Sequence, residues 1–344
     1  METLKTQIDA LCAGGVPDRL VFCAGCGDRV LFRHIHDGLS GAENRLSEHT
    51  RFDLASVTKS LATATLTLLA FDRGTLSPDT PVSRFYACPE EKKALTVERL
   101  LTHTVGVGHL SLCVPGVGYD NVAQYILSVP CEVPVGSEVR YSCPGYILLG
   151  KILEKLYDRR LDDAFEKEVA RPLGLMNTGF LPKGTDFVNA NLSPEESGLV
   201  NDYNCRFLGG VAGNAGLFSD CADMERYVAF LLHGGRELLR PGTLYAATRE
   251  HTPKGACEAF GWGFVYVDGR YKQTGTLFPR GSFGHCGHTG QSVFVDPASG
   301  RWALILSDAT VSTVRACGAE RYEEVKAFRK NLHDLAARAL FPCV

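Results

Sequence analysis

RFDLASVTKSLATATLTLL, residues 51–69, is the stretch that decides the fold and the chemistry of this sequence. Ser56 and Lys59 stand three residues apart near its start, and the apolar run behind them predicts a helix that ends at Arg73, before Gly74. Residues three apart share one face of a helix, so the hydroxyl and the amine can meet. Free N–H groups at a helix N-terminus can hold an oxyanion, and a lysine in an apolar cleft can deprotonate a serine. An ordinary capped surface helix gives the same pattern, so its context decides the interpretation.

The composition is that of a globular protein with one large domain or two interleaved ones. The chain has 344 residues, 45% of them hydrophobic and 22% charged. Its net charge is −3 and no basic run stands out, so we expect no nucleic-acid partner. The first residues, METLKTQIDALCAGG, lack the pattern of a signal peptide, and the apolar run LATATLTLLAF is too short to span a bilayer. We therefore expect a cytoplasmic protein with no membrane partner.

Thirteen cysteines are scattered along the chain, an odd number unlike a secreted disulfide framework. We expect most of them to be reduced thiols that pack as small apolar groups. Cys23-Ala-Gly-Cys26 is the only C-x-x-C motif, and a zinc ribbon would need a second such pair. The motif is therefore interpreted as a strand–turn–strand that carries two cysteines.

Strand-like segments lie at both ends of the chain and helical segments in the middle. After an amphipathic helix in TLKTQIDALCAGG, RLVFCAGCGDRVLFRHI predicts a hairpin. FGWGFVYVDG, SFGHCGHTGQSVFVDP and GRWALILSDAT predict further strands, followed by a C-terminal amphipathic helix. We predict an α/β fold in which an antiparallel sheet domain, residues 1–57 and 245–344, is flanked by the terminal helices. A mostly helical domain, residues 58–244, is inserted into it, with the active site at the interface.

The order of the motifs resembles that of one enzyme superfamily. After S-x-x-K come LLTHTVG (100–106), RPLGLMNTGF (171–180) and GGVAGNAGLFSDCADMERYVAFLLHGG (209–235). Together they resemble the serine β-lactamase and penicillin-binding-protein superfamily, and most of all its branch of class C β-lactamases, D-aminopeptidases and family VIII esterases. The resemblance covers nearly the whole chain. It implies the β-lactamase/transpeptidase-like fold, acyl transfer from a small-molecule substrate to Ser56, and no cofactor, and it leaves the oligomeric state open.

Tyr141-Ser142-Cys143 occupies the place of the family's Tyr-x-Asn motif, just before a helix. The resemblance implies that Tyr141 relays a proton between Ser56 and the leaving group. Cys143 stands where the family has Asn, and a thiol is a poor hydrogen-bond donor to a substrate carbonyl. This departure puts β-lactam or peptide turnover in doubt more than ester cleavage.

GHCGHTG, residues 284–290, resembles the family's Lys-Thr-Gly or His-Thr-Gly strand beside the active site. Aligned through the following VFVDP, His285 takes the place of Lys or His, while Cys286 and Gly287 take the places of Thr and Gly. The literal His-Thr-Gly at 288–290 then lies three residues after the position of the family motif.

On one continuous strand, His285, Gly287 and Thr289 would share a face, and Cys286 and His288 would share the other. The resemblance implies that the backbone N–H groups of Ser56 and His288 form the oxyanion hole.

Two other features of the sequence have alternative interpretations. His285, Cys286 and His288 could hold a metal, but the sequence has no H-E-x-x-H motif and no second cysteine pair, so we expect none. GGVAGNAGLFS lacks the Gly-Lys-Ser/Thr ending of a phosphate-binding loop. Asn214 within it is a candidate substrate contact, together with Cys143, Cys286 and Gly287.

The sequence therefore predicts a serine hydrolase in which Ser56 is acylated, Lys59 is the base and Tyr141 the proton shuttle. His285 could orient a substrate carboxylate or assist the shuttle. The first choice of activity is an esterase or amidase acting on a small acyl compound. The alternatives are a D-amino-acid peptidase or β-lactamase, and a catalytically weak binding or sensor domain on the same scaffold.

Overall fold

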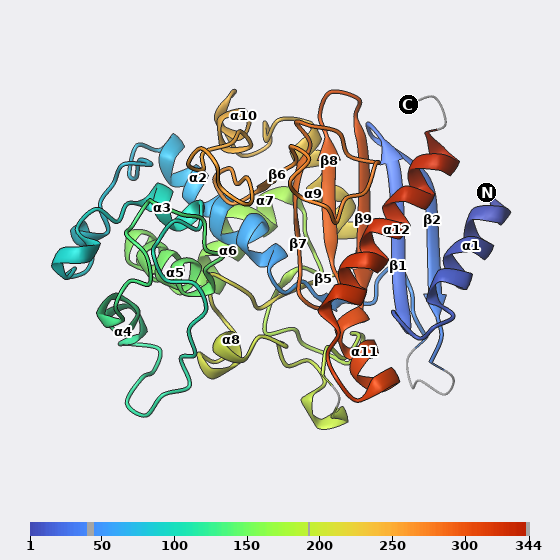
Figure 1. Cartoon of the computed structure of the whole chain (residues 1–344), viewed down its shortest axis with the longest axis horizontal. Coiled ribbons are helices and arrows are strands. Elements are labelled where there is room, and N and C mark those ends of the chain that lie inside the picture. Colours follow the sequence, from blue (N-terminus) through green and yellow to red (C-terminus); the bar gives the residue numbers. More distant parts are fainter. Residues whose placement is uncertain (40–44, 192, 342–344) are drawn as a thin grey trace.

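The computed structural model of the chain describes residues 1–39, 45–191 and 193–341. An antiparallel six-stranded sheet with the order β2-β1-β9-β8-β7-β6 runs through the described residues (Figure 1). Its strands are β1 (Arg19–Cys26), β2 (Arg29–Asp37), β6 (Val265–Tyr266), β7 (Phe283–Cys286), β8 (Ser292–Asp296) and β9 (Arg301–Ser307).

The two ends of the chain meet in this sheet, as the sequence predicts. β1 pairs with β2 as the expected hairpin, and on its other side β1 pairs antiparallel with β9. The strands that follow the middle of the chain therefore continue the sheet begun by the N-terminal hairpin. The predicted α/β fold with an antiparallel sheet is confirmed.

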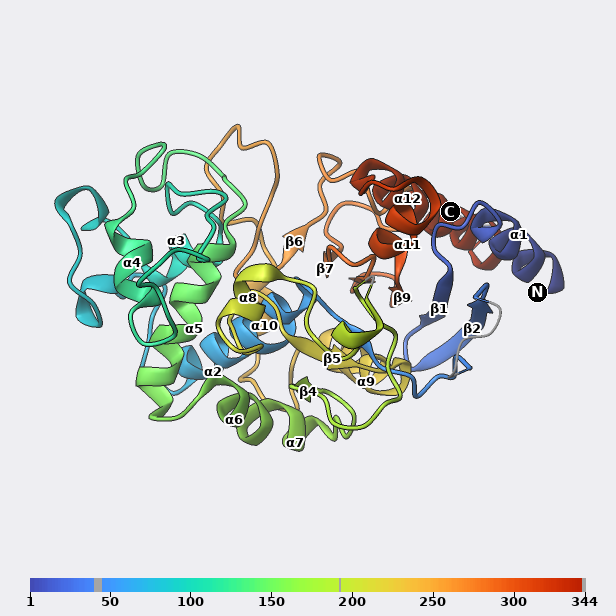
Figure 2. The same cartoon turned by 90° about the horizontal axis from the view of Figure 1, so that it is seen from below.

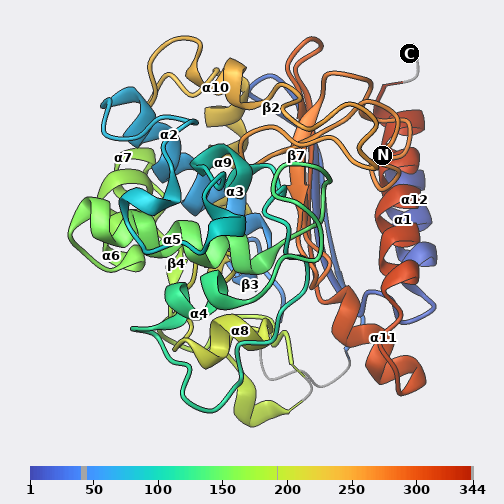
Figure 3. The same ribbon diagram turned by 60° about the vertical axis from the view of Figure 1, so that its left-hand side comes forward.

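One face of the sheet is covered by α1 (Glu2–Cys12) and α12 (Tyr322–Leu340), with α11 (Ala309–Cys317) beside them (Figure 3). Leu4 and Ile8 of α1 and Phe328 and Leu332 of α12 are buried in one apolar cluster with the sheet. This is the outcome that their three-and-four spacing predicts.

The helices of the middle of the chain lie on the other side of the sheet (Figures 2 and 3). They are α2 (Thr65–Asp72), α3 (Val97–Leu101), α4 (Val122–Ser128), α5 (Cys143–Tyr157), α6 (Leu161–Phe165), α7 (Arg171–Leu173), α8 (Tyr203–Phe207), α9 (Cys221–Leu232) and α10 (Thr243–Ala247), with the π-helices η1 (Lys59–Ala64) and η4 (Glu166–Ala170) and the 3-10 turns η2 (Val82–Arg84), η3 (Glu90–Lys92) and η5 (Pro194–Glu196). A small second sheet joins β3 (Phe52–Asp53), β5 (Leu217–Ser219) and β4 (Gly179–Phe180).

The helix that follows Ser56 is the central element of the molecule. All residues of η1, and those of α2 as far as Ala70, are buried. The hydroxyls of the buried threonines on this segment donate to main-chain carbonyls, so the burial leaves them satisfied. The first part of this helix is π-helical, a conformation that often marks functional sites. The domain limits at 57/58 and 244/245 remain a prediction. α9 lies within the range assigned to the insertion, yet it packs against β8 and β9 of the sheet.

No helix among residues 1–39, 45–191 and 193–341 is long and apolar enough to cross a membrane. Every cysteine in these ranges is a free thiol.

Candidate active site

Ser56 lies in a tight turn between β3 and η1. Ala55 has φ +45°, which is strained for a residue with a side chain, and its N–H donates to Asp53 Oδ1 at 2.8 Å. Strain of this kind persists only where the surrounding structure imposes it. The buried Asp53 carboxylate therefore fixes the turn that presents the serine.

Lys59 brings its amine to the serine. Lys59 Nζ donates to Ser56 Oγ at 2.9 Å and to the main-chain carbonyl of Asn214 at 2.9 Å. Lys59 is fully buried, and no ion pair joins it to a carboxylate among the described residues. The predicted pair on one helical face is therefore brought together, with the amine held by neutral groups.

Cys143 and Asn214 complete the surroundings of the lysine. Cys143 begins α5, and its Sγ accepts from Lys59 Nζ at 3.5 Å. Asn214 takes part through its carbonyl oxygen. Its side chain is 0% exposed, and neither of its polar atoms has a hydrogen-bond partner among the described residues. A direct contact of this side chain with substrate, expected from the sequence, therefore has no support in its placement.

Tyr141 is held from one side by His103. The two rings stack with centroids 4.3 Å apart, and His103 Nδ1 accepts the N–H of Ser142 at 2.9 Å. His103 is buried and has φ +58°. Burial, and then the nearby Lys59, holds its pKa well below the usual range, so the ring is neutral.

The phenol of Tyr141 lies close to both Ser56 and Lys59. Lys59 Nζ is 5.1 Å from the centre of the tyrosine ring. Although Tyr141 remains 40% exposed, removal of water from its phenol raises its pKa well above the usual range. The Cys143 thiol adds to the rise and a hydrogen bond with Ser56 opposes it. Tyr141 is therefore protonated at neutral pH, a state that can give a proton away.

β7 forms the opposite wall of the site. His285 pairs with Val293 of β8, is buried, and its ring centre lies 6.4 Å from that of Tyr141. Its Nδ1–H donates to the carbonyl of Cys286 at 2.8 Å. Burial, together with Lys59, lowers the pKa of His285 to about 3, so this ring is also neutral at pH 7.

The expectation of one strand through residue 290 is wrong. β7 ends at Cys286, and the chain turns back, with Gly287 N–H donating to Gln291 O at 2.9 Å and Gly290 at φ +119°. Glycine is suited to such a turn because a side chain would be strained there. Thr289 does not share the face of His285. It is buried, and its hydroxyl donates to Asp53 O at 2.9 Å.

Side chains alternate only as far as the strand continues. His285 faces the pocket beside Tyr141, whereas Cys286 packs in the apolar cluster of α12 and also borders the pocket. The side chain of His288 pairs with Glu320 (Nε2 to Oε1, 2.6 Å) and stacks on Tyr322 with ring centres 4.9 Å apart.

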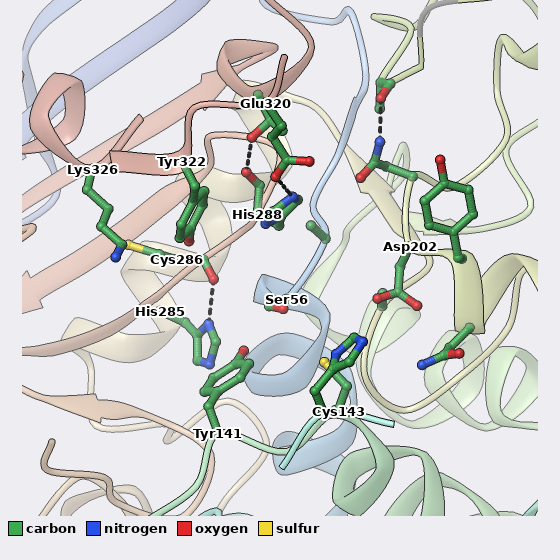
Figure 4. Close-up of a pocket in the computed structure, with 18 of the residues that line it drawn as sticks. Ser56, Tyr141, Cys143, Asp202, His285, Cys286, His288, Glu320, Tyr322 and Lys326 are labelled. Carbon is green, nitrogen blue, oxygen red and sulfur yellow. Dashed lines mark hydrogen bonds and ion pairs between the residues drawn. The ribbon is translucent and has the colours of Figure 1, made fainter. Parts of the chain in front are cut away.

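The main-chain amides of Ser56 and His288 are available as donors. Neither N–H donates to a protein acceptor within the described ranges. Both residues border one pocket of about 920 Å³, which Tyr141, Cys143 and His285 also line (Figure 4). Asp202, Glu258 and Lys326 are charged residues farther along its walls.

The loop that raised the question of a metal does not gather its ligands. His285 and His288 direct their rings to separate partners, the Cys286 carbonyl and Glu320. Within the described residues, three potential ligand side chains come within 4.8 Å of one another at Cys23, Cys221 and Glu225. Both oxygens of Glu225 already accept from Arg33.

Three residues of the site region were not identified from the sequence. Asp53 shapes the serine turn, His103 stacks on Tyr141, and Arg329 of α12 reaches the carbonyl of Gly287. A signal existed for Arg329, because it stands between Val325 and Leu332 on the apolar stripe of its helix. His103 was visible only as part of a family motif.

A half-buried serine touching a buried lysine, at a pocket beside a sheet edge, is typical of serine enzymes that transfer acyl groups. The sequence model of the Beta-lactamase family matches residues 11–327. The chain therefore belongs to the β-lactamase family, and it is a serine hydrolase.

Relatives and solved structures agree with this membership. A protein of Escherichia coli strain K12 named "Putative D-alanyl-D-alanine carboxypeptidase" is 29% identical over 309 residues, 77% of this chain and 70% of that protein. The octameric penicillin-binding protein homologue from Pyrococcus abyssi superposes with a TM-score of 0.75 at 18% identity, over 97% of this chain and 76% of that one. EstCE1, a hydrolase with promiscuous acyltransferase activity, gives 0.73 at 21% identity, over 96% and 99%. At these identities the two structures show a shared fold.

Proposed function

We propose that the protein is an esterase or amidase that forms an acyl-enzyme on Ser56 from a small acyl substrate. The observation that carries this proposal is the 2.9 Å contact between Lys59 Nζ and Ser56 Oγ inside the pocket. A hydroxyl is a weak nucleophile unless a neighbouring group takes its proton, and Lys59 is the group in contact with it.

The proposed reaction uses the described groups in turn. Lys59 takes the proton as Ser56 Oγ attacks the substrate carbonyl, and the N–H groups of Ser56 and His288 stabilise the oxyanion. The protonated phenol of Tyr141 then gives a proton to the leaving group and is reprotonated through Lys59. Water hydrolyses the acyl-enzyme, or another nucleophile intercepts it.

Two groups of the site favour an ester over a peptide with a free carboxylate. Cys143 offers a thiol where the resembled family has an amide, so a substrate amide carbonyl gains little from it. His285 is neutral at pH 7 and so supplies no charge to a carboxylate. Lys326 also lines the pocket, but its Nζ pairs with Glu323 of its own helix at 2.5 Å.

A D-amino-acid peptidase is the second candidate, because relatives in Escherichia coli and Salmonella carry the name "Putative D-alanyl-D-alanine carboxypeptidase". A β-lactamase activity and a catalytically weak binding or sensor role are the remaining candidates, ranked below the peptidase.

Parallel labelling with a fluorophosphonate and a fluorescent penicillin, on the wild type and Ser56→Ala, tests these candidates. We expect fluorophosphonate labelling of the wild type alone, with little labelling by penicillin. Strong labelling by both reagents would favour the peptidase or β-lactamase. A wild type that neither reagent labels would overturn the proposal.

A further inference from the structure

We propose that Arg329 is a positioning residue that aims the His288 N–H at the reacting carbonyl and strengthens it as a donor. The inference rests on the proposed function, because it concerns the oxyanion hole of that reaction. It gives the buried charge of Arg329, on the face of the sheet covered by α12, a role in catalysis.

Arg329 reaches the turn after β7 from α12. Its Nη2 donates to the carbonyl of Gly287, and its Nε donates to the carbonyl of Gly290 at 3.3 Å. Its Nη1 donates to Gln273 Oε1 at 2.5 Å and to the hydroxyl of Tyr322 at 3.4 Å. One guanidinium therefore ties both ends of the turn to α12.

Because the peptide bond is planar, this contact also sets the direction of the His288 N–H. The carbonyl of Gly287 and the N–H of His288 belong to one peptide group, which is trans, so they point in opposite directions. The carbonyl points to Arg329 of α12, on one side of the sheet. Ser56 directly precedes η1, which continues into α2, and α2 lies with the helices of the middle of the chain on the other side (Figure 3). The N–H of His288 is thereby turned toward the pocket that it shares with Ser56.

The next peptide group, between His288 and Thr289, is fixed as well. The hydroxyl of Thr310 donates to the carbonyl of His288. With Gly287 O and His288 O both held, rotation of the amide between them would break a buried hydrogen bond. The donor is therefore oriented before a substrate arrives, which is the condition for effective oxyanion stabilisation.

The charge of Arg329 is unusual for its location. The residue is 0% exposed, and no carboxylate pairs with it in the described part of the chain. A buried cation without an anionic partner is costly, and an arginine does not escape the cost by losing its proton. The charge lies one peptide behind the oxyanion hole, where it polarises the Gly287–His288 amide and favours negative charge in the transition state.

A purely structural tie between α12 and the turn would use the same hydrogen bonds, so the test needs a readout of the transition state. We would compare Arg329→Met, Arg329→Gln and Arg329→Lys with the wild type, and use Lys330→Met on the same helix as control. Lys330 is about half exposed and pairs with Asp334, away from the turn. The readouts are kcat and KM for p-nitrophenyl butyrate, the inhibition constant of an arylboronic acid, whose tetrahedral serine adduct places an oxygen in the oxyanion hole, and Tm.

We expect Arg329→Met to lower kcat about tenfold to a hundredfold, because loss of a whole oxyanion donor costs roughly a hundredfold to a thousandfold. KM should change little, boronate affinity should fall in parallel with kcat, and Arg329→Lys should recover part of both. If Arg329→Met does not fold, Arg329→Gln and Arg329→Lys give the same comparison. Lys330→Met should behave as the wild type.

Unchanged kcat and boronate affinity at a temperature where the variants remain folded would overturn the inference, even if Tm falls. Fluorophosphonate labelling of the wild type and Ser56→Ala, run alongside, separates the two failures. A wild type labelled at Ser56 together with fully active Arg329 variants overturns the role of Arg329 alone. An unlabelled wild type overturns the proposed function and the inference with it.

Discussion

Lys59 Nζ and Cys143 Sγ lie 3.5 Å apart, so a thiol borders the lysine that contacts the nucleophile. Cys143 opens α5 directly after Ser142, whose side chain caps the helix by accepting from the N–H of Gly145. The position is therefore set by the helix start, whatever side chain stands there. The choice of side chain bears on substrate selection rather than on folding.

Cys143→Asn should shift selectivity toward amides. A carboxamide can donate to a substrate carbonyl, and such a hydrogen bond contributes up to about 1.5 kcal/mol, about tenfold in rate. We expect kcat/KM for an amide or for nitrocefin to rise about tenfold relative to that for p-nitrophenyl butyrate. Cys113→Asn, which also borders the pocket, is the matched control. An unchanged amide-to-ester ratio would contradict this role.

His285→Ala should damage turnover more than His288→Ala. The ring of His285 is buried beside Tyr141, whereas the ring of His288 pairs with Glu320 and, in the proposed reaction, only its main chain acts. We expect a fall in kcat/KM of about tenfold or more for His285→Ala and about twofold or less for His288→Ala. The measurement is kcat/KM of both variants for p-nitrophenyl butyrate. A larger fall for His288→Ala than for His285→Ala would overturn the alignment through VFVDP.

The double variant His285→Lys, Cys286→Thr should improve the use of substrates with a free carboxylate. The wild-type ring is neutral at pH 7, and an ammonium there would supply a charge-assisted hydrogen bond of about 1.5–3 kcal/mol. We expect the ratio of kcat/KM for a D-alanyl-D-alanine peptide to that for a neutral ester to rise about tenfold. Arg240→Lys, a substitution between basic residues outside the pocket lining, should leave this ratio unchanged.

Local patterns in the sequence were enough to predict the parts of the fold that depend on short spacing. The S-x-x-K spacing, the N-terminal hairpin and the apolar stripe of α12 each involve residues within one or two turns or strands. The turn at 287–291 was not predicted, although its glycines are a turn signal. Gly290 has φ +119°, which a residue in a continuous strand does not have.

The residues that could not be predicted act over long sequence separations. His103 contacts the main chain of Ser142, and Arg329 contacts that of Gly287. In each case a side chain binds a main-chain atom whose identity the sequence does not encode. The burial that neutralises His103 also results from tertiary packing.

His103→Asn should slow the reaction without unfolding the protein. Asparagine tolerates the positive φ at this position and can accept the N–H of Ser142, but it removes the ring that stacks on Tyr141. We expect kcat to fall about tenfold, with KM nearly unchanged, because an ordered tyrosine is lost. His251→Asn, which removes a ring stacked on Trp262 outside the pocket lining, is the control. Equal losses in both variants would point to stability instead.

Asp53→Asn should change how stability depends on pH. Burial raises the pKa of Asp53 to about 6, above its usual value of 3.8, despite N–H groups from Asn201 and Ala55 that oppose the rise. The folded state therefore holds this proton more tightly, so the contribution of Asp53 alone to the free energy of unfolding falls by about 3 kcal/mol as pH rises from about 4 to about 6 and does not change above. Asn does not titrate, so the unfolding free energy of Asp53→Asn, measured with urea, should lack this pH-dependent contribution. The variant should be less stable than the wild type at low pH, because the amide nitrogen of Asn cannot accept an N–H. The control Asp120→Asn, at an exposed residue, should keep the wild-type dependence of the unfolding free energy on pH. The same wild-type dependence in Asp53→Asn would show that another group titrates in this range.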